Sequence, residues 1–218
     1  MAPLISLNCP NKMAPTNTKQ LLKPLHVPWM VSPSTPFLVM HFSESGGDDG
    51  DFPSYVEFIA YNRLFKEELA EGTSGRYVQV VSPPPLGFFR SIDGESAGAY
   101  QLVRLQFSCA SQARVLPSFS DSQVIEESAY DWSLVTGAWD GQEDIRDWLK
   151  RGNEDWRETG LSPNPGAYEV ERSHWLQKSG PSTDDDQWHH YLVVGHDCYA
   201  EVIAQGIRII YGQVLENW

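Results

Sequence analysis

The sequence predicts an α+β fold: a single domain in which a mixed or mainly antiparallel sheet is packed by two or three helices. Short apolar runs with the alternation typical of strands recur along the chain, and two segments combine helical spacing with capping signals. A chain of 218 residues, 41% of them hydrophobic, can also bury a core without disulfides or metal. We expect a proline-rich tail over residues 1–36, partly disordered, and the α+β domain at residues 37–218.

The tail is defined by its prolines, which remove backbone donors and disfavour helix in the preceding residue. They are Pro3, Pro10, Pro15, Pro24, Pro28, Pro33 and Pro36. Within this segment, "LLKPLHVPWM" could dock onto the domain through Leu22, Leu25 and Trp29. Met13 is an alternative start, and the first residues lack the basic and apolar regions of a signal peptide.

The strongest helical signal follows a short apolar strand predicted at residues 37–42. Ser54 and Glu57 have the spacing of a capping box, and apolar residues then recur close to helical periodicity. We therefore expect a helix over residues 55–71, with its apolar stripe in the core. The acidic loop between these two elements lacks the ligand spacing of an EF-hand, so we interpret it as a solvated turn.

Two further strands are predicted at residues 76–81 and 99–110, from their alternation and β-branched content. The segment "SQARVLPSF" (residues 111–119) is expected to return antiparallel beside the second of these strands. Residues 120–135 fit either an amphipathic helix or a pair of short strands, and we favour a short helix. No glycine-rich phosphate-binding motif accompanies these elements, so no cofactor is predicted.

A helical region is predicted from residue 140 onward, because Asp140 can cap it and Gly152 can end it. Its expected buried stripe consists of Ile145, Trp148 and Leu149. A second short helix, capped by Asn153, is expected to follow. The remainder of the chain is expected to be strand-rich, beginning with a strand at residues 167–171.

Charge divides the chain into two unequal halves. Residues 1–120 carry 10 acidic and 9 basic side chains, whereas residues 121–218 carry 19 acidic and 7 basic ones, for a net charge of −13. An acidic surface repels the phosphate backbone, so we expect neither nucleic acid nor an anionic membrane as a partner. A basic protein or a cationic ligand would be attracted. The three cysteines are widely spaced and form no CxxC motif, which favours a reducing, cytoplasmic location.

The stretch "QWHHYLVVGHDCYAEV" (residues 187–202) concentrates histidine around an apolar run and raises the hypothesis of a metal or catalytic centre. On a straight strand, His190 and His196 would lie about 20 Å apart, too far to share an ion. We therefore predict no metal site, and instead a β-hairpin with His196 and Asp197 at its tip. His196, Asp197, Glu201 and Cys198 remain weak catalytic candidates, because Cys198 could equally be buried and Glu201 could lie on a solvated face.

Aromatic residues are the other candidate binding groups. Seven of the eight tryptophans fall in the acidic half, and tryptophan faces attract cations. We expect Trp132 and Trp148 to be core anchors. The expected binding residues are Trp139, Trp156, Trp188, Asp184, Asp185 and Asp186.

Two hypotheses about function follow from these patterns. The first is an acidic protein-binding domain of the inhibitor or immunity type, which neutralises a basic partner through its C-terminal half. The alternative is a small-molecule enzyme that uses His196, Asp197 and Glu201 in an aromatic pocket. The sequence does not indicate an oligomeric state.

Overall fold

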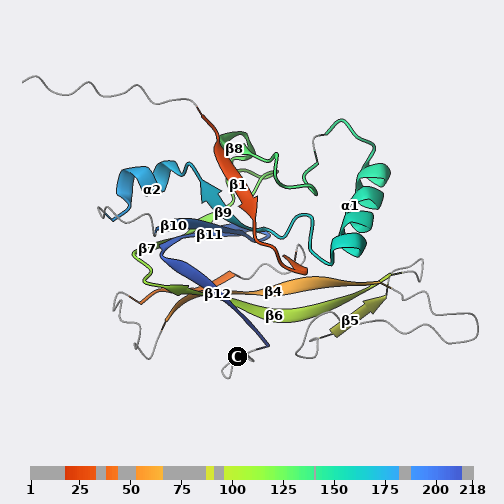
Figure 1. Ribbon diagram of the computed structural model, residues 1–218, viewed down its shortest axis with the longest axis horizontal. Helices are drawn as coiled ribbons and strands as arrows, with labels where there is room; N and C mark the ends of the chain where they lie inside the picture. The colour runs from red at the N-terminus through yellow and green to blue at the C-terminus, as the bar shows by residue number, and fades with distance from the viewer. Residues whose placement is uncertain are drawn as a thin grey trace, which may run out of the picture.

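The computed structural model describes residues 18–32, 38–43, 53–65, 87–90, 96–139, 141–181 and 188–212, and these form two facing β-sheets (Figure 1). Sheet A has the strand order β7-β11-β10-β9-β1-β8. Its strands are β1 (Gln20–Pro24), β7 (Gln112–Pro117), β8 (Tyr130–Asp131), β9 (Ala167–Glu171), β10 (His189–Val194) and β11 (Cys198–Ala204). Sheet B has the order β12-β6-β4-β2, with β3 also paired to β4 and β5 to β6. Its strands are β2 (Trp29–Val31), β3 (Leu38–His41), β4 (Ser54–Phe65), β5 (Gly87–Arg90), β6 (Ser96–Ser108) and β12 (Gly206–Tyr211).

The predicted α+β class is wrong, because the described part of the chain is mainly β. Its α-helices are α1 (Ile145–Thr159) and α2 (His174–Ser179), with a 3-10 turn at Glu127–Ala129. In Figure 1, α1 stands at one end of the molecule and α2 at the other, so the two helices do not form a continuous layer over either sheet. The sheets instead bury each other.

The predicted helix at residues 55–71 is wrong, and its first part is strand β4. Val56, Phe58 and Ala60 alternate on the core face and are at most 2% exposed, which is the period of a strand. The apparent capping box has other partners, because the Ser54 hydroxyl accepts from the Ser43 amide and Glu57 pairs with Arg104. Residues 66–71 lie outside the described residues, as does the strand predicted at 76–81.

The two sheets are joined at one corner because two chain segments pass from one sheet to the other. β6 continues into β7 and β11 continues into β12, so the same pair of segments forms ladders in both sheets. At the bend the Gln205 amide donates to the Ser108 carbonyl, and Cys109 has a φ of 48°. The expected pairing of residues 111–119 beside residues 99–110 is therefore wrong, since β7 pairs with β11.

The main core lies between the sheets, and a second apolar cluster covers the opposite face of sheet A. The second cluster contains Leu22, Ile125, Tyr130, Val135, Tyr168, Val170 and Leu192. Sheet A is thus a middle layer, with the segment around residues 125–138 on its outer side. Leu22 and Trp29, both 0% exposed, dock as expected, and each lies in a strand, β1 and β2 respectively.

The remaining predictions have mixed outcomes. Strands expected at 37–42, 99–110 and 167–171 correspond to β3, β6 and β9. The short helix favoured at 120–135 is wrong, because that segment forms the 3-10 turn, β8 and irregular chain.

Helix α1 differs from its prediction in its ends and in its buried face. It is capped by the Asp144 side chain, which accepts from the Arg146 amide, and it continues through Gly152 to end at Gly160. The expected buried stripe is wrong for Ile145 and Leu149, which are 53% and 49% exposed. The helix instead packs through Trp156, which is 6% exposed. The spacing of apolar residues in the sequence therefore did not indicate which turn of the helix contacts the sheets.

Candidate binding site

The histidine-rich stretch forms the predicted hairpin, with β10 and β11 paired from His189↔Ala204 to Val194↔Tyr199. Alternation places the two adjacent histidines on opposite faces of sheet A. His189 lies on the face toward sheet B, where its Nδ1 is 2.6 Å from a Glu169 carboxylate oxygen. His190 lies on the outer face and is 1% exposed. The doubled histidine therefore belongs to two separate networks.

His190 is held between a hydroxyl and a carboxylate. Its Nδ1 is 2.8 Å from Ser173 Oγ, and its Nε2 is 3.1 Å from Glu201 Oε1. Trp175 of α2 packs edge-on against the imidazole, with ring centroids 5.2 Å apart. The short helix α2 thus covers the polar pair, and Ser173 is its N-cap.

Glu201 is 3% exposed and also accepts from Arg114, whose Nε lies 2.6 Å from Oε2. The guanidinium of Arg114 stacks over the Trp175 ring at 4.2 Å. Burial alone would raise the pKa of the Glu201 carboxyl. The hydrogen bonds from His190 and Arg114 outweigh burial and lower this pKa below its usual value.

The Ser173 hydroxyl contacts the His190 imidazole, which in turn contacts the Glu201 carboxylate. A nucleophilic triad has the same order of groups. Ser173 is 3% exposed, however, and its Oγ already accepts the Leu176 amide as a helix cap. A nucleophile must reach its substrate, and this hydroxyl is enclosed. We therefore interpret the group as a structural network that fastens α2 to sheet A.

The four catalytic candidates from the sequence do not converge. His196 and Asp197 lie at the exposed hairpin tip, with 3.7 Å between Nε2 and Oδ1, whereas Glu201 is buried. Burial raises the pKa of the Cys198 thiol, which disfavours the nucleophilic thiolate. Among the described residues, no cluster of three or more histidine, cysteine or acidic side chains could hold a metal ion.

A groove of about 870 Å³ lies on the outer side of sheet A, beside β8 and the N-terminal end of α1. Three tryptophans line it, together with carboxylates, amides and one lysine. Its main lining residues are Lys19, Gln123, Glu127, Tyr130, Asp131, Trp132, Trp139, Trp148 and Asn164. We call this cavity the tryptophan groove.

Each of the three indole N–H groups is bonded to a backbone carbonyl within the protein. Trp132 donates to Glu127, Trp139 to Glu143 and Trp148 to Gly137, each at 3.1 Å. The tryptophans can therefore offer a ligand mainly their ring surfaces. Trp139 is the most accessible of the three tryptophans, because 53% of it is exposed.

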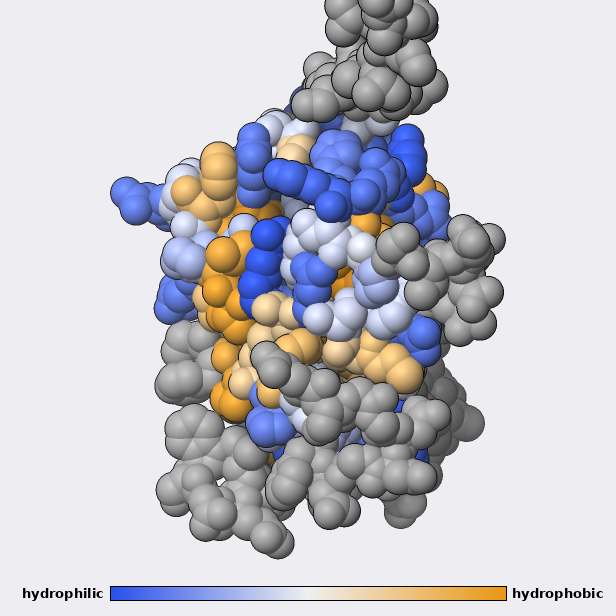
Figure 2. All heavy atoms as spheres, turned by 90° about the vertical axis from the view of Figure 1, so that its left-hand side faces the viewer, coloured by the Kyte–Doolittle hydropathy of each residue, from blue (hydrophilic) through white to orange (hydrophobic). Residues whose placement is uncertain are grey.

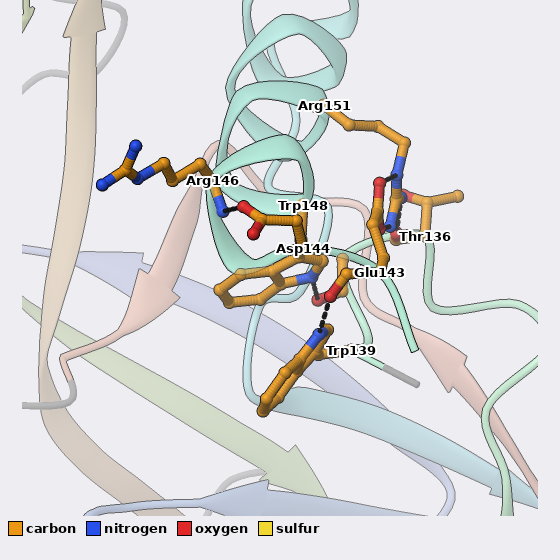
Figure 3. A network of polar contacts seen from close by, with 8 residues as sticks. Thr136, Trp139, Glu143, Asp144, Arg146, Trp148 and Arg151 are labelled. Atoms are coloured by element: carbon orange, nitrogen blue, oxygen red, sulfur yellow. Dashed lines mark hydrogen bonds and ion pairs between the residues drawn. The ribbon is translucent and has the colours of Figure 1, made fainter. Parts of the chain in front are cut away.

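Trp139 and Trp148 lie together below the first turn of α1 (Figure 3). Their ring centroids are 6.3 Å apart and their planes are inclined by 41°. Two rings need about 7 Å between them to admit a third flat group, twice an ordinary contact distance. A bound side chain would therefore lie on the outer surface of Trp139 rather than between the two rings.

Arg151 anchors the chain on both sides of Trp139. Arg151 of α1 donates through Nε and Nη2 to the Glu143 carboxylate, at 3.3 and 2.7 Å, and through Nη1 to the Thr136 carbonyl at 2.6 Å. Figure 3 shows Arg151 in contact with Thr136 and Glu143, which lie on either side of Trp139 in the chain. The aromatic surface is therefore positioned before any ligand arrives.

The groove carries two carboxylates with different partners. Hydrogen bonds from Ser133, together with Arg172, lower the pKa of the Asp131 carboxyl. Glu127 receives only a hydrogen bond from Gln123 at 3.4 Å, and it forms no ion pair among the described residues. Glu127 is thus the groove carboxylate whose charge remains available to a cation.

The predicted binding residues are distributed unevenly. Trp139 lines the groove, whereas Trp156 is buried and donates to the Pro28 carbonyl, so its expected exposure is wrong. Trp188 is half-buried, and Asp184, Asp185 and Asp186 lie outside the described residues. Trp132 and Trp148, expected in the core, are both only partly buried and line the groove, although Trp132 also packs against the second apolar cluster. The hydrogen bonds from their indole N–H groups to nearby carbonyls could not be predicted from the sequence.

Comparisons with family models, with curated protein sequences and with solved structures give no match. In the described part of the chain, the helices are too short and too polar to cross a bilayer.

Proposed function

We propose that this chain is a binding protein that takes a basic segment of a protein partner in the tryptophan groove. One observation carries the proposal: an exposed, preorganised indole face at Trp139 shares a groove with Glu127, a carboxylate that forms no ion pair with the described residues. Lysine and arginine side chains bind aromatic faces through the ring quadrupole, and a nearby carboxylate adds a charge-assisted hydrogen bond.

The charge of the whole molecule supports the same class of partner. A net charge of −13, concentrated after residue 120, would steer a basic protein toward this half of the chain. An inhibitor or immunity-type protein that neutralises a basic partner fits this description. The free thiols of Cys109 and Cys198 favour a reducing compartment, so a cytosolic location is part of the proposal.

The enzymatic alternative has less support. It requires His196, Asp197 and Glu201 to face one pocket, whereas two are at an exposed turn and the third is buried against His190 and Arg114. The basic-partner proposal needs no rearrangement of these residues.

The proposal is tested by titrating the protein with an arginine-rich peptide and with the same peptide in which each arginine is replaced by glutamine. We expect only the arginine-rich peptide to bind. Trp139→Ala should weaken its binding about tenfold, or about 1.4 kcal/mol, because a cation–π contact and its buried area are lost. Isothermal titration calorimetry measures both affinities.

Two further variants locate the site within the groove. Glu127→Gln should weaken binding while retaining the shape of the side chain, and Arg151→Met should weaken it by releasing the Trp139 loop. Ile145→Ala is the matched control, since Ile145 is exposed to the same extent as Trp139 but does not line the groove. Equal affinity of the wild type and Trp139→Ala would contradict the proposal, as would equal binding of the two peptides.

A further inference from the structure

Sheet A ends in two very different edge strands. The edge strand β8 has two residues, whereas the opposite edge strand β7 has six and pairs only with β11 among the described strands. Val115 within β7 and Phe119 just after it are 44% and 56% exposed. Figure 2 faces the side of the molecule on which β7 lies and shows apolar surface gathered there beside polar surface. An exposed strand edge of this length is a template for another strand.

The hydrogen-bond pattern shows which backbone groups of β7 point outward. The Ser118 amide donates to the Asp197 carbonyl, in register with the Pro117↔Cys198 pair. In an antiparallel ladder bonded pairs alternate, so the even-numbered residues of β7 bond to β11. The backbone groups of Ala113, Val115 and Pro117 consequently point to the free edge.

We propose that β7 pairs antiparallel with β7 of a second copy of this chain, centred on Val115, so that the two copies of sheet A become one continuous sheet. In a symmetric antiparallel pair, residues that lie opposite each other must be on the same face of the sheet. This condition is met only when the symmetry axis passes through a residue paired with its own copy, and not between two residues. With Val115 at the centre, its N–H and C=O bond reciprocally to Val115 of the second copy. Each Ala113 N–H then meets a Pro117 carbonyl, and the missing N–H of Pro117 forfeits only one bond at each end.

Side-chain chemistry favours self-pairing at this edge. Residues 111–120 contain no acidic side chain, although the chain has 29. The Val115 side chains would meet across the axis, which is a favourable β-branched pair. Phe119 lies four residues, or about 13 Å, from the centre, and would cover Ser111 of the second copy. Arg114 points to the opposite face and is already bonded to Glu201, so it does not oppose the pairing.

The proposal is tested first by mass. Size-exclusion chromatography with light scattering on the full chain should give a mass that rises from 24.6 kDa toward twice that value with increasing concentration. Val115→Pro removes both central donors, and proline is tolerated at an edge position whose N–H faces solvent, so the variant should fold but remain monomeric. Val115→Thr keeps the donor and the β-branch and should still dimerise.

Amide hydrogen exchange provides a readout that does not depend on any variant. The amides of Ala113 and Val115 should become more protected as concentration rises, whereas those of Arg114 and Leu116, which already bond to β11, should not change. A monomer at every concentration up to the millimolar range would overturn the proposal. So would a dimer that persists in Val115→Pro, or protection that appears in β12 instead of β7.

Discussion

His190 and Glu201 show how the neighbours of a residue decide the interpretation of its role. On the sequence they were separate candidates, one for a metal and one for a solvated or catalytic carboxylate. The spacing argument correctly separated His190 from His196, because it relied only on the rise of a strand. The partners of His190 and Glu201, however, include Ser173 and Arg114, which are distant in sequence. No local pattern could identify them, because they meet only through sheet pairing.

The lowered pKa of Glu201 leads to a prediction about acid stability. Because the folded state holds this pKa below the usual 4.5, the carboxylate stabilises the fold above that pH. The stabilisation is lost as pH falls through the folded pKa. Glu201→Gln should therefore cost on the order of 3 kcal/mol at neutral pH, by leaving Arg114 and His190 without their carboxylate. Urea unfolding at a series of pH values measures the difference between wild type and variant.

This difference should shrink progressively as the pH falls below 4.5, and it should be smallest below the lowered folded pKa, where the wild-type carboxylate also becomes neutral. Glu154→Gln is the control, because its ion pair with Lys150 is exposed and separated by 3.9 Å, so it should change stability little at any pH. If the difference in unfolding free energy between wild type and Glu201→Gln stayed constant from neutral to acid pH, the charge of Glu201 would not stabilise the fold.

At the scale of the element, the sequence identified strands better than helices. The β9 strand and the β10–β11 hairpin were predicted because alternation and turn residues agree with their final environment. The β4 strand was missed because aromatic residues at helical spacing are equally compatible with alternation when both faces are partly covered. The length of α1 was missed because Gly152 looked like a stop signal, although a glycine can also lie inside a helix.

Gly152 within α1 and Gly160 at its C-cap give a matched prediction. A Cβ at Gly152 would meet only Pro163 Cγ, at 3.9 Å, an ordinary contact. Gly152→Ala should therefore stabilise the protein by about 0.5–1 kcal/mol, because alanine loses less entropy in a helix. Gly160 caps the helix with a φ of 69°, so Gly160→Ala should destabilise it by about 1 kcal/mol. Thermal or urea unfolding of both variants tests this. If both substitutions shifted stability in the same direction, the observed helix boundary would be contradicted.

For the whole molecule, charge makes the two proposed interactions respond oppositely to salt. A basic peptide is attracted by the net charge of −13, whereas two copies of the chain repel each other. Raising the ionic strength from 0.01 to 0.15 M shortens the screening length from about 30 to about 8 Å. Peptide binding at the tryptophan groove should therefore weaken, and pairing through β7 should strengthen, over the same range. Titration calorimetry and light scattering on one preparation measure both trends. If the two affinities changed in the same direction, one surface would be responsible for both, and the separation of the groove from the β7 edge would be wrong.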